Sequence, residues 1–301
     1  MDFGRTNQLE LVNFALPSNH QGVKKVLGGA KAQLPHVYVG GVLWSDEAFL
    51  GTIYPERAKS KDYAKYYSRQ FNTIELNLTH YRLPEKEKIQ RWFEESPVDF
   101  KFCPKIHQAI SHSGNLLSVV DYMEAFYQIV KPLQHKLGTC LLQLPPHFSP
   151  KRCHELLAFL DKSNLRDLAI ELRHPDWFIE GKELNLLSNY LYKNQMGLVL
   201  TDTPMRRDVL HMRLTNKTAF IRFNANDKHP SDYERIDEWM HHLYEWIQQG
   251  LETIYFFIHT PTQLFMPELV TYSIQQLKKE CGVTLTPPKI KTMSGDTGKL
   301  F

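Results

Sequence analysis

The stretch DLAIELR (residues 167–173) shows the pattern that decides the fold of this 301-residue chain. It is a short apolar, β-rich run that ends in charged residues, and a helix-like segment follows it. Because side chains of a strand alternate between its two faces, Glu171 and Arg173 point to the same side. Six further runs repeat the pattern: NTIELN (72–77), DFKFCPK (99–105), TCLLQL (139–144), LVLTD (198–202), AFIRFN (219–224) and TIYFFIH (253–259).

The order of these runs predicts an α/β fold, a single TIM-type (β/α)8 barrel. HVYVG (36–40) supplies an eighth strand, and the intervening segments are long enough for parallel crossovers. A barrel of this kind needs about 250 residues, which the span 36–281 provides. Start signals and apolar spacing predict helices at 60–70, 84–95, 118–136, 149–162, 182–194, 231–249 and 262–280. PMRRDVLHMRLT (204–215) has the weakest helical pattern, so we expect the region after strand six to be short or irregular.

The sequence predicts a cytoplasmic protein with one main domain. No linker, low-complexity tract or repeat interrupts 36–281, so we predict an N-terminal extension (1–35), one barrel domain (36–281) and an irregular tail (282–301).

A formal charge of +3 gives no bulk sign of nucleic-acid binding. No apolar run approaches the ~20 residues of a membrane span, and the N-terminus lacks a signal-peptide core. The four cysteines form no CxxC pair, which argues against a zinc knuckle or disulfide framework. Oligomeric state does not follow from these features.

The chain also resembles a known family. FNTIELNLTHYRLP (71–84), FKFCPKIHQAISH (100–112), LGTCLLQLPPHF (137–148) and LAIELRHPDW (168–177) are similar, in order, to blocks of the YecE-like family of uncharacterised proteins, domain of unknown function 72. The resemblance covers most of residues 38–260. It implies a barrel similar in overall shape to those of the xylose-isomerase and endonuclease-IV type, and it implies no particular activity.

Several polar residues match the family's blocks, and three segments depart from them. The matching residues are Glu75, Asn77, Tyr81, Arg82, Lys105, His112, Gln143, Glu171, Arg173, His174 and Trp177. GGVLW (40–44) keeps Gly40 and Trp44 but lacks the family's Thr-Ser pair. RFNA (222–225) keeps Arg222 without the usual histidine, and FFIHT (256–260) has His259 where the family has asparagine.

The polar strand ends predict an anion site. In barrels of this type the loops after the strands open around one cavity. Two arginines and Lys105 would fix a phosphate or carboxylate there. We predict catalytic roles for Glu75, Lys105, Glu171 and Asp202, and ligand contacts from Asn77, Tyr81, Arg82, His112, Gln143, Arg173, His174, Trp177, Arg222, His259 and Trp44.

Each role has a plainer alternative. Glu75 and Glu171 would serve as general base and acid if their surroundings separate their pKa values, but buried ion pairing would also explain them. Lys105 is able to form a Schiff base, although pairing with a glutamate or holding an anion is favoured, because nearby acids keep an ammonium protonated. Trp44 and Trp177 would either stack on a ligand or pack the loops.

No metal or other cofactor is predicted. Glu75, Glu171, Asp202 and His259 are of types that bind divalent ions, but the neighbouring cations would repel such an ion and no HxH or HExxH spacing occurs.

The favoured function is an enzyme, a lyase, isomerase or hydrolase, that binds a phosphorylated or otherwise anionic small molecule at the barrel mouth. One alternative is a nucleic-acid-binding or phosphodiesterase-like barrel, which the mild charge disfavours. Another is a ligand sensor that uses the same pocket without turnover.

Overall fold

The computed structural model describes residues 6–29, 34–163, 165–179 and 181–291. All eight predicted strands form, and every strand ladder is parallel. The strands are β1 (His36–Gly40), β2 (Thr73–Leu76), β3 (Lys101–Pro104), β4 (Cys140–Gln143), β5 (Leu168–Glu171), β6 (Gly197–Asp202), β7 (Thr218–Asn224) and β8 (Thr253–His259). β2, β4, β5 and β6 are buried along their whole length, which explains their continuous apolar runs.

The hydrogen-bonded ladders divide these strands into two sheets. Six strands pair in the order β1-β8-β7-β6-β5-β4, and β2 pairs with β3 separately. Over the described residues only isolated bridges connect the β3 and β4 regions, and no ladder joins β1 to β2. The fold is therefore α/β with a mostly parallel sheet, and the predicted closed barrel is not confirmed.

Individual hydrogen bonds cross both seams between the two sheets. The amide of Asn72 donates to the Val37 carbonyl at 2.8 Å and accepts from the Val39 N–H at 2.8 Å, so one side chain takes the place of ladder bonds between β1 and β2. A Cβ at Gly40 would lie 2.2 Å from the Thr73 carbonyl oxygen, which shows how closely these backbones approach. At the other seam, the Gly138 N–H donates to the Phe102 carbonyl at 2.7 Å.

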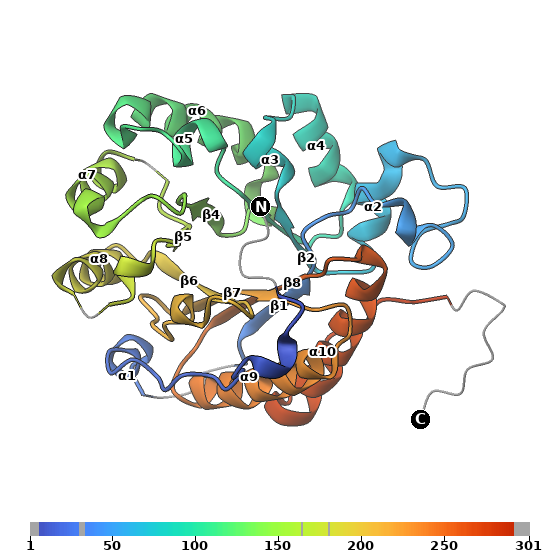
Figure 1. Cartoon of the computed structure of the whole chain (residues 1–301). Coiled ribbons are helices and arrows are strands. Elements are labelled where there is room, and N and C mark those ends of the chain that lie inside the picture. Colours follow the sequence, from blue (N-terminus) through green and yellow to red (C-terminus); the bar gives the residue numbers. More distant parts are fainter. Residues whose placement is uncertain (1–5, 30–33, 164, 180, 292–301) are drawn as a thin grey trace.

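Helices surround the strands on the outside (Figure 1). They are α1 (Val23–Leu27), α2 (Tyr63–Tyr67), α3 (Leu78–Tyr81), α4 (Lys86–Glu95), α5 (Gln108–Ser111), α6 (Val120–Val130), α7 (Cys153–Lys162), α8 (Lys182–Lys193), α9 (Pro230–Gln248) and α10 (Met266–Cys281). All seven predicted helices are confirmed, with boundaries shifted by a few residues, whereas the short α1, α3 and α5 were not predicted. The region after β6 holds only a 3₁₀ turn, Arg207–Val209, as its weak pattern predicts.

The apolar core has two parts. The larger part lies between strands and helices, and a smaller cluster comprises Cys103, Leu141, Ala169, Val199, Phe220, Tyr255 and Phe257. This smaller cluster takes residues from β3 to β8, all on the face that does not meet the helices. Two residues further along several strands, on the same face, lie the polar side chains of the candidate site.

Segments at both ends of the chain pack onto this framework. The Phe14 carbonyl accepts from Arg207 at 2.8 Å, Asn19 accepts from the Trp246 indole at 2.8 Å, and the Lys289 N–H donates to Gln70 at 2.8 Å. Of the predicted extension and tail, residues 1–5, 30–33 and 292–301 lie outside the described part.

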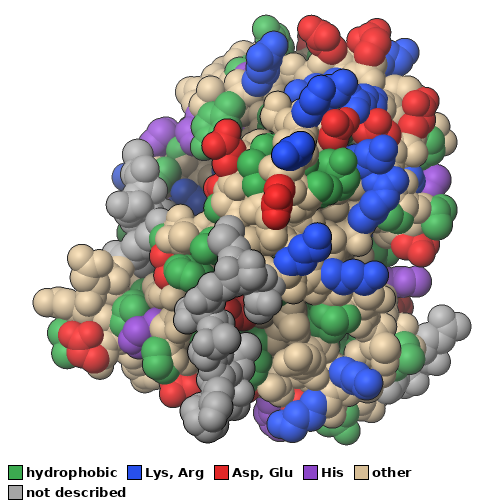
Figure 2. Space-filling view, turned by 90° about the vertical axis from the view of Figure 1, so that its right-hand side faces the viewer, with side chains coloured by type: hydrophobic (Ala, Val, Ile, Leu, Met, Phe, Trp, Pro, Cys, Tyr) green, Lys and Arg blue, Asp and Glu red, His purple; other side chains and the backbone are tan. Residues whose placement is uncertain are grey.

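The surface carries mixed charge. On the face shown in Figure 2, Lys and Arg side chains are interspersed with Asp and Glu. None of the helices in the described part of the chain is both long and apolar enough to cross a bilayer.

Candidate functional site

A cavity of about 660 Å³ opens where the strands end. Both sheets contribute to it: Asn77 follows β2 and Lys105 follows β3, whereas Gln143 ends β4 and His259 ends β8. The other polar residues that line it are His80, Tyr81, Gln108, His112, His147, Arg173, Arg222, Asn224 and Gln263. Ten of the fifteen predicted site residues lie here or directly beneath: Glu75, Asn77, Tyr81, Lys105, His112, Gln143, Glu171, Arg173, Arg222 and His259.

Arg222 holds two carboxylates together at the base of the cavity. Its Nε and Nη2 donate to the two oxygens of Glu75 at 2.8 and 2.9 Å. Its Nη1 donates to both oxygens of Glu171 at 2.9 Å. All three side chains are at least 94% buried. One guanidinium thus joins β2, β5 and β7 through charge-assisted hydrogen bonds.

Neighbouring side chains complete the partners of these carboxylates. Glu171 accepts from Gln143, from the Thr201 hydroxyl at 2.9 Å and from Arg173 Nη2 at 3.4 Å. His259 Nε2 lies 3.3 Å from Glu75. Burial lowers the pKa of His259, so its ring is neutral near neutral pH.

The surroundings of the two glutamates lower the pKa values of both. Burial would raise the pKa of Glu171, but Arg173 and Arg222 outweigh it and hold this pKa at about 2. For Glu75 burial acts in the same direction, and Arg222 with His259 holds the pKa well below its ordinary value. Because the pKa values of both glutamates are lowered, their surroundings do not separate these values in the way that a general base and a general acid require. Both groups remain charged and hydrogen bonded to Arg222.

Lys105 differs from the other charged residues of the site. Its side chain is 94% buried and lines the cavity. Among the described residues its ammonium has no hydrogen bond or ion pair, so of the two favoured roles the pairing with Glu75 or Glu171 is not formed, whereas the role of holding an anion stays a prediction. Both carboxylates instead form ion pairs with Arg222. Burial, followed by the charge of Arg222, lowers the pKa of Lys105 to about 8.

Two imidazoles lie beside this lysine. The His80 and His112 rings meet edge to face with centroids 5.3 Å apart. His80 Nδ1 is 2.7 Å from the Ile106 carbonyl, which only accepts, so Nδ1 carries the proton and Nε2 keeps its lone pair. Burial and then the charge of Lys105 lower the pKa of His80 to about 4, and the same two causes lower the pKa of His112. Both rings are neutral proton acceptors near neutral pH.

The structure places Asp202 outside the site, which corrects its predicted catalytic role. In the β6–β7 register Thr201 lies opposite Arg222, so Thr201 shares the cavity face and Asp202 points the other way. There Asp202 accepts from Arg207, from Arg235 at 3.1 Å and from the Trp239 indole at 2.8 Å. The hydrophilic end residue of LVLTD belongs to a buried contact with α9.

Four predicted ligand contacts also lie elsewhere. Trp44 packs edge to face on Trp92 with centroids 4.9 Å apart, and the Trp177 indole donates to the Phe148 carbonyl at 2.8 Å. Both tryptophans therefore pack loops, the second of the two alternatives. His174 accepts from the Asp176 N–H at 3.2 Å and caps a 3₁₀ turn (Pro175–Trp177). Arg82 is exposed and does not line the cavity.

Six polar residues of the site were not among the predicted site residues. They are His80, Gln108, His147, Thr201, Asn224 and Gln263. His80 and Gln108 belong to the short helices α3 and α5, which the strand pattern does not predict. Thr201 could have been predicted, because it follows Val199 by two residues and therefore lies on the same face of β6 as this apolar side chain.

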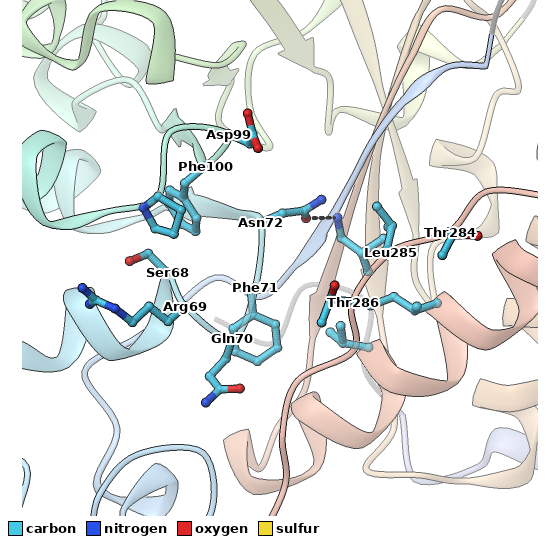
Figure 3. Close-up of a pocket in the computed structure, with 14 residues that line it drawn as sticks. Ser68, Arg69, Gln70, Phe71, Asn72, Asp99, Phe100, Thr284, Leu285 and Thr286 are labelled. Atoms are coloured by element: carbon cyan, nitrogen blue, oxygen red, sulfur yellow. Dashed lines mark hydrogen bonds between the residues drawn. The ribbon is translucent and has the colours of Figure 1, made fainter.

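A second cavity, of about 470 Å³, lies by the N-terminal ends of β2 and β3 (Figure 3). Ser68, Asn72, Asp99 and Phe100 line it together with residues 284–286, and none of the predicted site residues does. Asn72 already satisfies two backbone groups of β1. This cavity therefore lies beside the seam between β1 and β2, whereas the side chains of the candidate site lie at the C-terminal ends of the strands.

No group of three or more His, Cys, Asp or Glu is arranged to hold a metal within the described residues. Between Glu75 and Glu171 the guanidinium of Arg222 occupies the position that a bridging cation would take.

Comparisons with known proteins confirm the resemblance seen in the sequence. UPF0759 protein YecE of Escherichia coli (strain K12) is 33% identical over 232 residues, which cover 71% of this chain and 85% of that protein. UPF0759 protein YunF of Bacillus subtilis (strain 168) is 27% identical over 234 residues, 72% of this chain and 80% of that protein.

Solved structures of similar proteins agree in fold. A DUF72 family protein from Enterococcus faecalis superposes with a TM-score of 0.63 at 18% identity and covers 86% of this chain and 100% of its own. Another, from Thermotoga maritima, gives 0.60 at 24% identity and covers 81% and 98%. The model of the family "protein of unknown function DUF72" matches residues 38–292. This chain therefore belongs to the DUF72 family.

Proposed function

We propose that this protein is an enzyme that binds an anionic small molecule, a phosphorylated compound or a carboxylate, in the cavity at the strand ends. The observation that carries the proposal is the charge of the cavity. Lys105 is buried beside Arg173 and Arg222 and lines this cavity, but its ammonium has no carboxylate partner among the described residues, because Glu75 and Glu171 pair with Arg222. A bound anion would balance its charge.

Proton transfer in this proposal falls to Lys105 and His112 rather than to the glutamates. A group transfers protons best when its pKa lies near the working pH. The pKa of Lys105 is lowered to about 8, whereas that of Glu171 is held at about 2. Glu75 and Glu171 fix Arg222 in place, and through it the base of the cavity.

We further propose that the two sheets complete an eight-stranded (β/α)8 barrel whose mouth is this cavity. The bonds across both seams support closure: Asn72 to β1 on one side, and on the other the Gly138 N–H and the Ile106 N–H, which donates to the Leu141 carbonyl at 2.8 Å. The inner apolar cluster from β3 to β8 supports it as well.

A thermal-shift titration tests the anion site. Inorganic phosphate and sugar phosphates should stabilise the wild-type protein, by about 2.7 kcal/mol at a hundred times the dissociation constant. Arg173→Ala should abolish this shift while the protein stays folded. Arg91→Ala, which removes a surface arginine paired with Asp62 and Glu95, is the matched control and should retain it.

The same titration, followed by an assay for turnover of each compound that binds, separates the alternatives. Stabilisation by oligonucleotides but not by small anions would replace the proposal with a nucleic-acid-binding function. Anion binding without turnover of any bound compound would identify a ligand sensor that uses the same residues.

A further inference from the structure

We infer that Lys105 is a nucleophile that forms a Schiff base with the carbonyl carbon of an aldehyde or ketone that also carries a phosphate or carboxylate group. This inference rests on the proposed anion site and narrows its ligand to a carbonyl compound. Its basis is the placement of one amine, which is buried, faces the cavity and has no ion-pair partner among the described residues.

The role follows from what surrounds Lys105. Arg222 takes up both carboxylates that would otherwise hold the ammonium in an ion pair. The Lys105 backbone has its own structural partners, because its carbonyl accepts from Thr79 at 2.7 Å and its N–H donates to the Leu76 carbonyl at 3.3 Å. The side chain is therefore not needed to join the strands and remains available to the cavity.

A second buried lysine shows what a structural amine looks like in this fold. Lys136 is 95% buried, as deeply as Lys105, and burial lowers its pKa too. Its ammonium, however, donates to the carbonyls of Phe93 and Ser96 and to the Ser96 hydroxyl. All three protons are used, so Lys136 is a matched control that is buried and that we expect to be unreactive.

The chemical step balances with the groups present. The Lys105 ammonium gives one proton to a neutral imidazole, and the free amine attacks the carbonyl carbon of the substrate. A C–N bond forms, and the carbonyl oxygen leaves as water with the second amine proton and the proton returned by the imidazole. The product is an iminium that carries the same single charge as the ammonium.

The iminium then supplies an electron sink. A C–H bond on the carbon next to it breaks, its electron pair moves toward the iminium nitrogen, and the proton goes to the neutral ring of His112. Reprotonation at another position and attack by water on the C=N bond release the product and restore Lys105. Arg173 lines the same cavity and would hold the anionic group of the substrate.

Pyridoxal 5′-phosphate is the probe, because it joins an aldehyde to a phosphate. The full-length protein would be mixed with limiting probe near neutral pH, reduced with borohydride and mapped by peptide mass spectrometry. With a pKa of about 8, Lys105 has roughly two orders of magnitude more neutral amine than an exposed lysine. We therefore expect labelling at Lys105 to be at least about tenfold faster than at Lys136 or at surface lysines, and inorganic phosphate to suppress it.

Two variants and one measurement separate this inference from the proposed function. Lys105→Arg keeps the charge and Lys105→Met keeps the length, and both should lose the adduct; the arginine variant should still be stabilised by phosphate. If phosphate stabilises the wild type but Lys105 is labelled no faster than Lys136, the Schiff-base role is overturned and the anion site stands. If neither phosphate nor any small carboxylate stabilises the wild type, the proposed function itself fails.

Discussion

Among single residues, Glu171 should make the folded protein sensitive to acid. Its pKa is about 2 in the folded state, because Arg173 and Arg222 outweigh the effect of burial, and about 4.5 in the unfolded chain. A lowered pKa stabilises the fold above the unfolded value, and this contribution disappears as the pH falls from about 5 to about 2. The loss amounts to about 3 kcal/mol.

Urea unfolding across this pH range measures the effect. Glu171→Gln cannot lose a charge on acidification, so its free energy of unfolding should fall by about 3 kcal/mol less than that of the wild type. Equal losses in the two proteins would show that Glu171 is not held ionised by its neighbours.

Arg222 should be the most sensitive single residue of the site. Arg222→Met leaves Glu75 and Glu171 buried without their main cation, which costs about 3–5 kcal/mol. The carboxylates of the variant would relieve this cost by taking up protons, so their pKa values rise above the unfolded value. Stability of the variant should then fall as the pH rises, opposite to the wild type below about pH 5. Chemical denaturation at about pH 5 and about pH 8 tests this, and a variant with the pH dependence of the wild type would contradict it.

The strand-end pattern predicted much of this site from the sequence. Glu75, Lys105, Glu171, Arg222 and His259 meet as expected, because side chains two apart on a strand share a face. Their pairing was not open to prediction, since it depends on which carboxylate lies within reach of which cation. That geometry leaves Lys105 without a partner among the described residues, although nearby acids suggested the opposite.

At the level of elements, the two faces of β6 should respond differently to mutation. Asp202→Ala would leave Arg207 and Arg235 without their shared carboxylate and should destabilise the protein by about 3 kcal/mol. Phosphate affinity should stay unchanged, because Asp202 faces α9. Thr201→Val removes only a hydroxyl that donates to Glu171 and should cost about 1 kcal/mol while weakening phosphate binding.

Unfolding and thermal-shift titrations of both variants test the assignment of faces. Weaker phosphate binding in Asp202→Ala, with Thr201→Val unaffected, would restore the original sequence prediction for Asp202.

The helices differ in how well their local sequence pattern predicts them. α9 and α10 were predicted from their apolar spacing, but α3 and α5 have four residues each and no such period to detect.

For the whole molecule, the alternation of strands and helices predicted the α/β class and the parallel order but not the division into two sheets. A ladder is interrupted by local details, such as the Asn72 side chain inserted between β1 and β2, and these leave no periodic trace in the sequence. The division matters for function, because the cavity takes Asn77 and Lys105 from the smaller sheet and Gln143, Arg222 and His259 from the larger one.

An anion bound in this cavity should therefore tie the two sheets together. In the free protein, β2 and β3 are joined to the other strands by separate local contacts, such as the ion pair of Glu75 with Arg222, whereas β7 and β8 share a continuous seven-residue register. Amides of β2 and β3 should exchange with deuterium through an opening that costs less than global unfolding. A ligand held by Lys105 on one sheet and Arg173 on the other opposes that opening.

Hydrogen exchange with and without phosphate measures both effects. Exchange of β2 and β3 peptides should be faster than that of β7 and β8 in the free protein, and phosphate should slow it selectively. In Arg173→Ala the selective slowing should vanish, because the larger sheet loses its contact with the ligand. Uniform slowing of all strands would mean that phosphate opposes only global unfolding, and the cavity would then not act as a link between the sheets.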